Sequence, residues 1–105
     1  MVNAFNSGDV SAVDALVSDD YVDHQGLGSG ALRGPDGFRQ VVAAARSGFV
    51  ELSAAVLDYV TEGDKVVARI EWRGTRQRGE IERRETIDIV RVTDGRAVEH
   101  WGARS

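Results

Sequence analysis

Residues 51–75, which read ELSAAVLDYVTEGDKVVARIEWRGT, decide the fold that we predict for this chain. Val, Leu and Tyr are frequent from Glu51 to Thr61, and apolar residues recur at every second position from Lys65 to Thr75, so both segments are expected to be β-strands. Glu62-Gly63-Asp64 between them has the composition of a tight turn. The stretch therefore predicts an antiparallel hairpin.

The residues that follow extend this hairpin. Arg76–Gly79 interrupts the pattern, and Ile81–Thr93 is expected to be a third strand. Asp94-Gly95 is a strong signal for a second tight turn, after which Arg96–Trp101 is the last predicted strand. Strands joined in this way form an antiparallel meander with one face on the core and the other in water.

The first half of the chain has the spacing of helices instead. Met1 to Ser7 is expected to be the end of a helix that Gly8 terminates, so the chain is expected to begin inside a longer element. Asp9 can cap a short second helix. The apolar face of that helix is expected to hold Val10, Val13 and Leu16 or Val17.

Another helix is predicted to open at Gly34-Pro35-Asp36, because proline leaves no N–H group unpaired in a first helical turn. Gly48 is expected to end this helix. Before it, Asp19 to Gly30 is polar and rich in glycine, and is expected to be a loop. The predicted buried face of the helix consists of Phe38, Val41, Val42 and Ala45.

These segments predict a single α+β domain over residues 1–105, since no repeat or linker separates them. Two or three N-terminal helices that lie across a curved antiparallel sheet form a cone with an open mouth. Such a fold offers a pocket for a small molecule.

Composition and charge exclude several classes of function. The 105 residues carry a net charge of −4, which argues against a nucleic-acid surface. The chain has no cysteine, and its 2 histidines are far apart without a motif, so no disulfide and no metal site are predicted. No membrane span, signal peptide or cofactor motif is visible, so we expect a cytoplasmic protein without a cofactor.

Five segments, taken in order, resemble SnoaL-like proteins, the group of polyketide and ester cyclases. The Glu-His-Trp sequence after the Asp-Gly turn is the most specific of them. The resemblance implies the cone-shaped fold of nuclear transport factor 2, usually as a homodimer through the sheet. The segments are Asn3–Asp9, Tyr21–His24, Gly34–Phe38, Trp72–Thr75 and Asp94–Trp101.

The resemblance also implies a chemistry. Characterised cyclases of this group close a ring of a polyketide ester by intramolecular aldol condensation, without a metal or an organic cofactor. A carboxylate removes a proton next to a carbonyl, which requires a base of raised pKa in an apolar cavity. In these enzymes the acid/base aspartate directly follows the His-Trp pair, and this chain has Gly102 at that position. Gly102 thus removes the strongest catalytic assignment, and a cyclase with this sequence would need its base from another group.

Three residues are candidates for proton transfer. His100 is expected to point inward together with Val98 and Gly102, either as a base or donor or as a core histidine. Asp88 lies in the middle of a strand, where it is either an inward base, a solvated carboxylate, or a partner of Arg84 or Arg69. His24, with Asp23 beside it, lies in the polar loop near the expected mouth, as a catalytic residue or a surface one.

Large apolar side chains are expected to form the walls of a pocket for a hydrophobic small molecule. The same residues could instead belong to the core or to a dimer interface. The predicted substrate-binding residues are Tyr21, Phe38, Tyr59, Trp72 and Trp101.

Two other functions stay open beside the cyclase hypothesis. One is a non-catalytic protein that binds a small molecule or serves as a dimeric interaction module, as Gly102 suggests. The other is an epoxide hydrolase of the limonene type, which uses an Asp-Arg-Asp set. Arg69 and Glu71 could supply two members of that set, although the strand pattern turns both outward and the third would again fall at Gly102.

Overall fold

The computed structural model describes residues 2–27 and 30–104, so Met1 of the first predicted helix, residues 28–29 of the predicted loop, and Ser105 lie outside it. Helices precede most of the strands along the chain. The elements, in chain order, are α1 (Val2–Ser7), α2 (Val13–Leu16), β1 (Val17–Asp23), β2 (Leu32–Arg33), α3 (Gly34–Ser47), β3 (Glu51–Glu62), β4 (Lys65–Thr75), β5 (Ile81–Thr93) and β6 (Arg96–Arg104).

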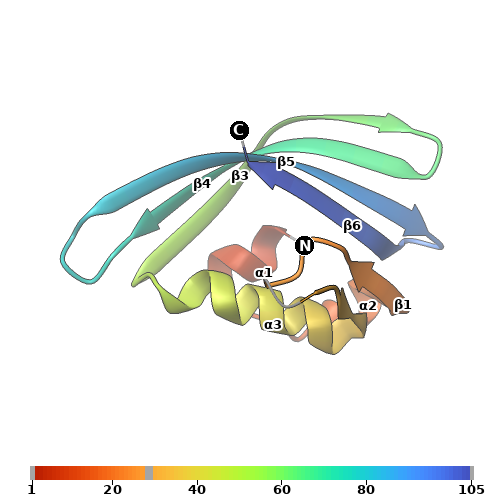
Figure 1. The fold of residues 1–105 in the computed structure, drawn as a ribbon, viewed down its shortest axis with the longest axis horizontal. Coiled ribbons are helices and arrows are strands. Elements are labelled where there is room, and N and C mark those ends of the chain that lie inside the picture. The colour runs from red at the N-terminus through yellow and green to blue at the C-terminus, as the bar shows by residue number, and fades with distance from the viewer. Residues whose placement is uncertain (1, 28–29, 105) are drawn as a thin grey trace.

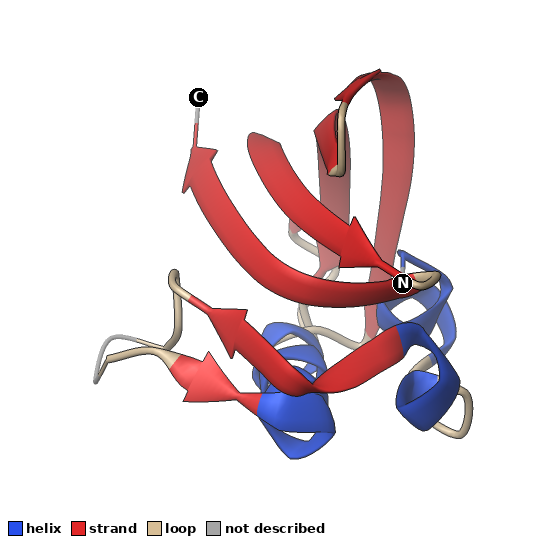
Figure 2. Ribbon diagram, turned by 90° about the vertical axis from the view of Figure 1, so that its right-hand side faces the viewer, coloured by secondary structure: helices blue, strands red, loops and turns tan. Residues whose placement is uncertain are grey.

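The strands form one curved sheet in the order β2-β1-β6-β5-β4-β3. Strands β3 to β6 are the predicted antiparallel meander, and their bounds match the expected ones within a few residues. The sheet arches over α1, α2 and α3, which cover its concave side (Figure 1). Seen from the side, the sheet bends strongly and does not close into a barrel (Figure 2). The predicted α+β fold with its curved sheet is confirmed.

The polar segment before α3 differs from the prediction, because it begins as a strand. Strand β1 runs parallel to β6, with Val22 opposite Glu99 and Asp23 opposite His100. Val17 and Tyr21 of this strand are each only 1% exposed. Alternate side chains of β1 thus enter the core, and the edge of the meander is extended by a parallel pair.

Strand β6 contains a second difference. Arg91 is opposite Glu99 whereas Val92 is opposite Ala97, so Val98 is the extra residue of a β-bulge. Ala97 is 3% exposed and belongs to the core. The expectation that Val98 shares the inner face with His100 is therefore wrong, because the bulge shifts the alternation by one residue.

The core lies between α3, the two short helices and the inner face of the sheet. Phe38 and Val42 of α3 are buried there, as the helical spacing predicted. The ring of Phe5 stands edge-on against Phe38 and also against Trp72, at centroid distances of 5.8 and 5.0 Å. These aromatic contacts hold the helix layer against β4.

None of the helices within the described ranges has the length and apolar composition that crossing a lipid bilayer would require.

Candidate functional site

His100 lies between two carboxylates on the concave face of the sheet. Its Nδ1 is 3.0 Å from Oδ1 of Asp23, and its Nε2 is 2.7 Å from Oδ1 of Asp88. The side chains of His100, Asp23 and Asp88 are 14%, 3% and 13% exposed. We call these three residues the Asp-His-Asp cluster.

Three adjacent strands bring the cluster together. Asp23 of β1 is opposite His100 of β6, and Asp88 of β5 is opposite Gly102, two residues further along β6. Residues two apart on a strand point to the same face, so His100 and Gly102 share the face toward which Asp88 points. Val90, the partner of His100 on β5, packs against the core, which identifies this face as the inner one.

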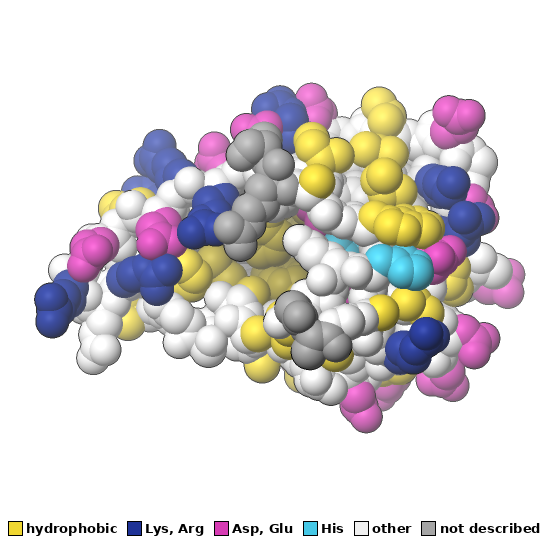
Figure 3. Space-filling model, viewed as in Figure 1, with side chains coloured by type: hydrophobic (Ala, Val, Ile, Leu, Met, Phe, Trp, Pro, Cys, Tyr) yellow, Lys and Arg dark blue, Asp and Glu magenta, His cyan; other side chains and the backbone are white. Residues whose placement is uncertain are grey.

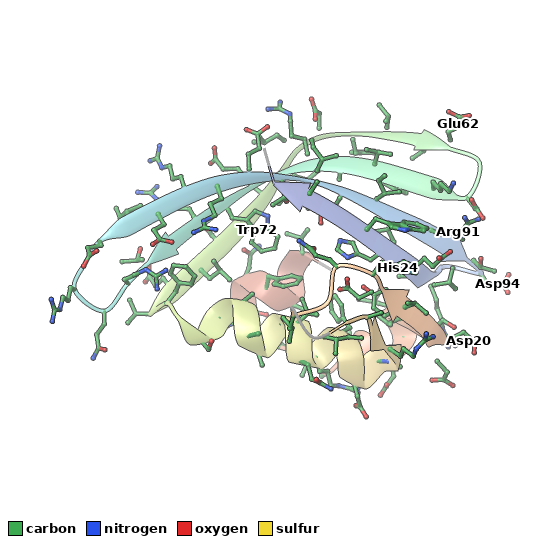
Figure 4. The ribbon with its side chains drawn as sticks, in the orientation of Figure 1. Asp20, His24, Glu62, Trp72, Arg91 and Asp94 are labelled. Carbon is green, nitrogen blue, oxygen red and sulfur yellow. The ribbon has the colours of Figure 1, made fainter. Side chains whose placement is uncertain are left out.

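Hydrogen bonds extend the cluster in both directions along the concave face. The hydroxyl of Thr86 donates to Oδ2 of Asp88 at 2.6 Å, and the indole N–H of Trp72 donates to the Thr86 oxygen at 2.8 Å. At the other end, the Tyr21 hydroxyl donates to Oδ2 of Asp23 at 3.4 Å. The network thus runs from β4 to β1, and Trp72 lies beneath the arch of the sheet (Figure 4).

The two carboxylates determine the charge of His100. Burial alone would favour the neutral ring, but the hydrogen bonds and charges of Asp23 and Asp88 outweigh it and raise the pKa of His100 to about 9. Burial also opposes the charge of Asp23, yet His100 and the N–H groups of Gly26 and Gln25 hold the pKa of Asp23 below its ordinary value. At neutral pH the cluster therefore contains an imidazolium between carboxylates.

Tyr21 remains a neutral phenol beside this cluster. Burial is the main cause that raises its pKa, and the negative charges of Asp23 and Asp88 act in the same direction. Tyr21 therefore keeps its proton and acts as a hydrogen-bond donor to Asp23.

This charge state assigns different roles to the cluster members. An imidazolium whose two N–H groups both donate to carboxylates has no lone pair with which to accept a proton. Asp88 has two carboxylate oxygens with about four acceptor positions, of which His100 and Thr86 use two. The cluster thus offers Asp88, rather than His100, as a proton acceptor.

The space beside Gly102 is occupied. A Cβ atom at position 102 would lie 2.5 Å from Oε1 of Gln25 and 3.0 Å from Oδ1 of Asp88. A side chain at this position would push the Gln25 amide aside and would crowd Asp88, since the first distance is below that of real Cβ contacts and the second is tight. Asp88 and Gln25 therefore lie where the side chain of any larger residue at position 102 would begin.

His24 lies apart from the cluster. Adjacent strand residues point to opposite faces, so His24 and Trp101 lie on the outer face. Their rings stack at a centroid distance of 5.1 Å, and Nε2 of His24 is 2.8 Å from Oε2 of Glu99. Glu99 also accepts a hydrogen bond from Arg91, and Figure 4 shows His24 beside β6. The structure does not bring His24 or Trp101 to the predicted site.

The other predicted wall residues lie in different environments. Tyr21 and Phe38 are 1% and 3% exposed and belong to the core, with their rings 6.3 Å apart. Tyr59 is 66% exposed on β3. Of the five predicted wall residues, Trp72 and Tyr21 touch the network of the cluster.

The epoxide hydrolase arrangement is not formed. Arg69 pairs with Asp58 and with Glu85, at 3.2 and 2.9 Å, on the outer face of the sheet. Glu71, two residues along the strand, is exposed on the same face. The predicted outward direction of Arg69 and Glu71 is confirmed, and neither reaches the Asp-His-Asp cluster.

The concave face is hollowed in the space-filling view, with hydrophobic side chains at its base between the sheet and α3 (Figure 3). Two separate concavities lie elsewhere on the described surface. One of about 490 Å³ is lined by the β4–β5 turn, including Arg76 and Glu80, and one of about 190 Å³ lies between α1 and α2. Neither is lined by a predicted site residue.

Sequence reasoning missed Asp23, Thr86 and Gln25. Asp23 was noted only as the neighbour of His24, and it bonds His100. Asp19 is polar and exposed between buried Val17 and Tyr21, so this segment lacks the regular alternation that would have revealed a strand. Across residues 2–27 and 30–104, no group of three or more His, Cys, Asp or Glu side chains is arranged to hold a metal ion.

Comparisons with known proteins show the family and the fold of this chain. The family model of the SnoaL-like domain matches residues 1–100. Wild-type IdmH from Streptomyces antibioticus, described as a candidate polyketide cyclase, is 30% identical, with a TM-score of 0.84 over 99% of this chain and 86% of its own. TsrD from Streptomyces laurentii is 28% identical, with a TM-score of 0.84 over 99% of this chain and 81% of its own.

A third solved structure supports the fold alone. This protein from an Exiguobacterium species is described as similar to nuclear transport factor 2. It is 21% identical, with a TM-score of 0.79 over 99% of this chain and 93% of its own. No curated protein matches the sequence at a significant level.

Proposed function

Because this chain belongs to the SnoaL-like family, we propose that it is a small enzyme of the cyclase or isomerase type that acts by general acid–base proton transfer on a hydrophobic carbonyl compound. A polyketide-like substrate is the class that the similarity to IdmH supports. The hollow lined by hydrophobic side chains under the sheet would hold it (Figure 3). A cytoplasmic location and a homodimer through the sheet remain predictions from the sequence.

Asp88 is the base in this proposal. Its carboxylate takes a proton from the carbon next to a substrate carbonyl, and the electrons of the broken C–H bond move to the carbonyl oxygen. The resulting enolate carbon attacks a second carbonyl of the same molecule and forms the C–C bond of the ring. The new alkoxide then recovers the proton from Asp88. Protons and electrons balance, so the step requires no oxidant or reductant.

One observation carries the assignment of Asp88. Its Oδ1 lies 3.0 Å from the position that a Cβ atom would take at Gly102, where the family resemblance places the acid/base aspartate. Asp88 and Gly102 are opposite one another on β5 and β6. The proposal therefore assigns the role of that aspartate to a carboxylate on the neighbouring strand.

His100 and Asp23 are positioning residues in this scheme. The imidazolium of His100 holds one oxygen of Asp88 at 2.7 Å, and buried Asp23 fixes the ring from its other side. The positive ring also reduces the repulsion between the two carboxylates. Both N–H groups of His100 thus hold the two carboxylates in place.

Hydrogen exchange at carbon tests the proposal without knowledge of the natural substrate. Wild-type protein is incubated in D₂O with β-tetralone, a bicyclic ketone, and deuterium at the carbon next to the carbonyl is measured by mass spectrometry. We expect exchange above the buffer rate, and a loss of about 100-fold in Asp88→Asn. His24→Gln on the outer face is the matched control and should keep the wild-type rate. Exchange at the buffer rate, or an active Asp88→Asn, would contradict the proposal.

A non-catalytic ligand-binding protein is the second candidate. The complete hydrogen bonding of the buried polar side chains favours it. Every buried side-chain nitrogen or oxygen in the described residues has a hydrogen-bond partner. A network of this kind also serves to stabilise a fold. If this candidate is correct, native mass spectrometry will detect an unchanged hydrophobic ligand, and Asp88→Asn will alter melting without altering any proton transfer.

A further inference from the structure

Gln25 lies in a turn that the Asp-His-Asp cluster itself holds in place. Oδ1 of Asp23 accepts hydrogen bonds from the backbone N–H groups of Gln25 and Gly26, at 3.0 and 3.3 Å. Gly26 has a positive φ of 58°, and a Cβ atom there would collide with the carbonyl oxygen of Gly30. The turn after β1 is thus defined by the same carboxylate that orients His100.

The side-chain amide of Gln25 lies over Gly102 beside Asp88. Its Oε1 and Cδ are 2.5 and 3.1 Å from the Cβ position of residue 102, and Oδ1 of Asp88 is 3.0 Å from the same point. Gln25 is exposed, and its side chain makes no hydrogen bond to the part of the chain that the structure describes. An amide and a carboxylate therefore lie side by side over Gly102, and the exposed amide is available to a ligand.

The proposed proton transfer requires a donor at this place. As the C–H bond breaks, negative charge develops on the carbonyl oxygen, and a nearby N–H group lowers the barrier by stabilising it. The nearest donors are already used within the network: both N–H groups of His100 bond carboxylates, Thr86 donates to Asp88, and Trp72 donates to Thr86. Rotation of the Gln25 amide about its last bond presents its NH₂ group to the same space.

We propose that Gln25 donates a hydrogen bond to the carbonyl oxygen of the substrate whose neighbouring carbon gives its proton to Asp88. This inference rests on the proposed function and names the substrate group that the site recognises, an uncharged ketone or ester carbonyl. Glycine at position 102 is part of this arrangement, because a Cβ atom there would lie against both the Gln25 amide and the Asp88 carboxylate. Gln25 selects and polarises the carbonyl, and Asp88 moves the proton.

Two substitutions separate this role from a structural one. Gln25→Ala removes the amide, and Gln25→Glu keeps the shape but replaces the NH₂ donor by a second carboxylate beside Asp88. We expect kcat for β-tetralone exchange to fall about 100-fold in each, which is the lower end of the range for loss of one donor to a developing oxyanion. Gln77→Ala, at an exposed glutamine of the β4–β5 turn, is the matched control and should keep the wild-type kcat. Melting temperature and the NMR titration of His100 should stay unchanged in Gln25→Ala.

The outcomes distinguish this inference from the proposed function. If wild-type protein exchanges β-tetralone and the two Gln25 variants match Gln77→Ala, the role of Gln25 is refuted and the role of Asp88 remains. If wild-type protein does not exchange β-tetralone, its binding is measured by NMR titration. A shift of the Gln25 side-chain NH₂ signals, together with weaker affinity in Gln25→Ala, supports carbonyl recognition by Gln25 without catalysis. Absence of that shift overturns the inference.

Discussion

Raising the pH from neutral to alkaline should weaken the fold, because His100 then loses the proton that holds it between Asp23 and Asp88. The folded-state pKa of His100 is about 9, above its ordinary value of 6.5. The stabilising contribution of His100 is therefore fully present below pH 6.5, declines as the pH rises, and is lost above pH 9. At ~1.4 kcal/mol per pH unit, the difference between the ordinary and the folded-state pKa of His100 corresponds to about 3 kcal/mol of unfolding free energy.

Neighbouring groups do not reverse this expectation. The pKa of Asp23 is lowered, so its stabilising contribution is present above its ordinary value of 3.8 and is lost only in acid. Burial raises the pKa of Tyr21, so the folded protein keeps this phenol neutral in the alkaline window. Asp88, the third group that faces His100, is the acceptor of its second N–H bond. The loss between neutral and alkaline pH is thus attributed to His100.

Urea unfolding, followed by the fluorescence of Trp72 and Trp101, measures this loss at about pH 6 and at about pH 9.5. The free energy of unfolding of the wild-type protein should fall by about 3 kcal/mol between the two conditions. His100→Gln should remove most of the difference, whereas His24→Gln should retain it. Equal stability of the wild-type protein at both pH values, or the same loss in His100→Gln, would refute a buried imidazolium between two carboxylates.

Three further substitutions test contacts on the inner and outer faces of the sheet. Gly102→Asp should slow β-tetralone exchange and lower the melting temperature, because its Cβ would push the Gln25 amide aside and crowd Asp88. The double variant Asp88→Ala/Gly102→Asp should recover part of both, and failure of any recovery would argue against crowding at Gly102. Gly74→Ala should destabilise the protein by about 1–3 kcal/mol in urea unfolding, because a Cβ atom there would overlap the ring of Phe49. Arg69→Ala, on the exposed outer face, should leave exchange and the melting temperature nearly unchanged, and a large loss of either would show that the outer face contributes to the site.

The meander could be predicted because its signals are local. The turn after Glu62 and the Asp94-Gly95 turn follow from residues whose backbone preferences act within a few positions, and Gly63 and Gly95 do have positive φ values of 58° and 76°. The helix that opens at Pro35 was predictable for the same reason. Alternation along the strands also predicted the outward direction of Arg69, whereas it left the direction of Asp88 open, and only packing could select one.

The chemistry of the site depended on contacts between distant parts of the chain. Asp23 and His100 are separated by 77 positions, and they meet only because β1 pairs in parallel with β6, a pairing that no turn signal announces. The space beside Gly102 is likewise defined by Gln25 from one strand end and Asp88 from another strand. Local conformational preferences thus specified the helices and hairpins, whereas the charge of His100 and the exposure of Asp88 arose from burial among residues that are remote in the chain.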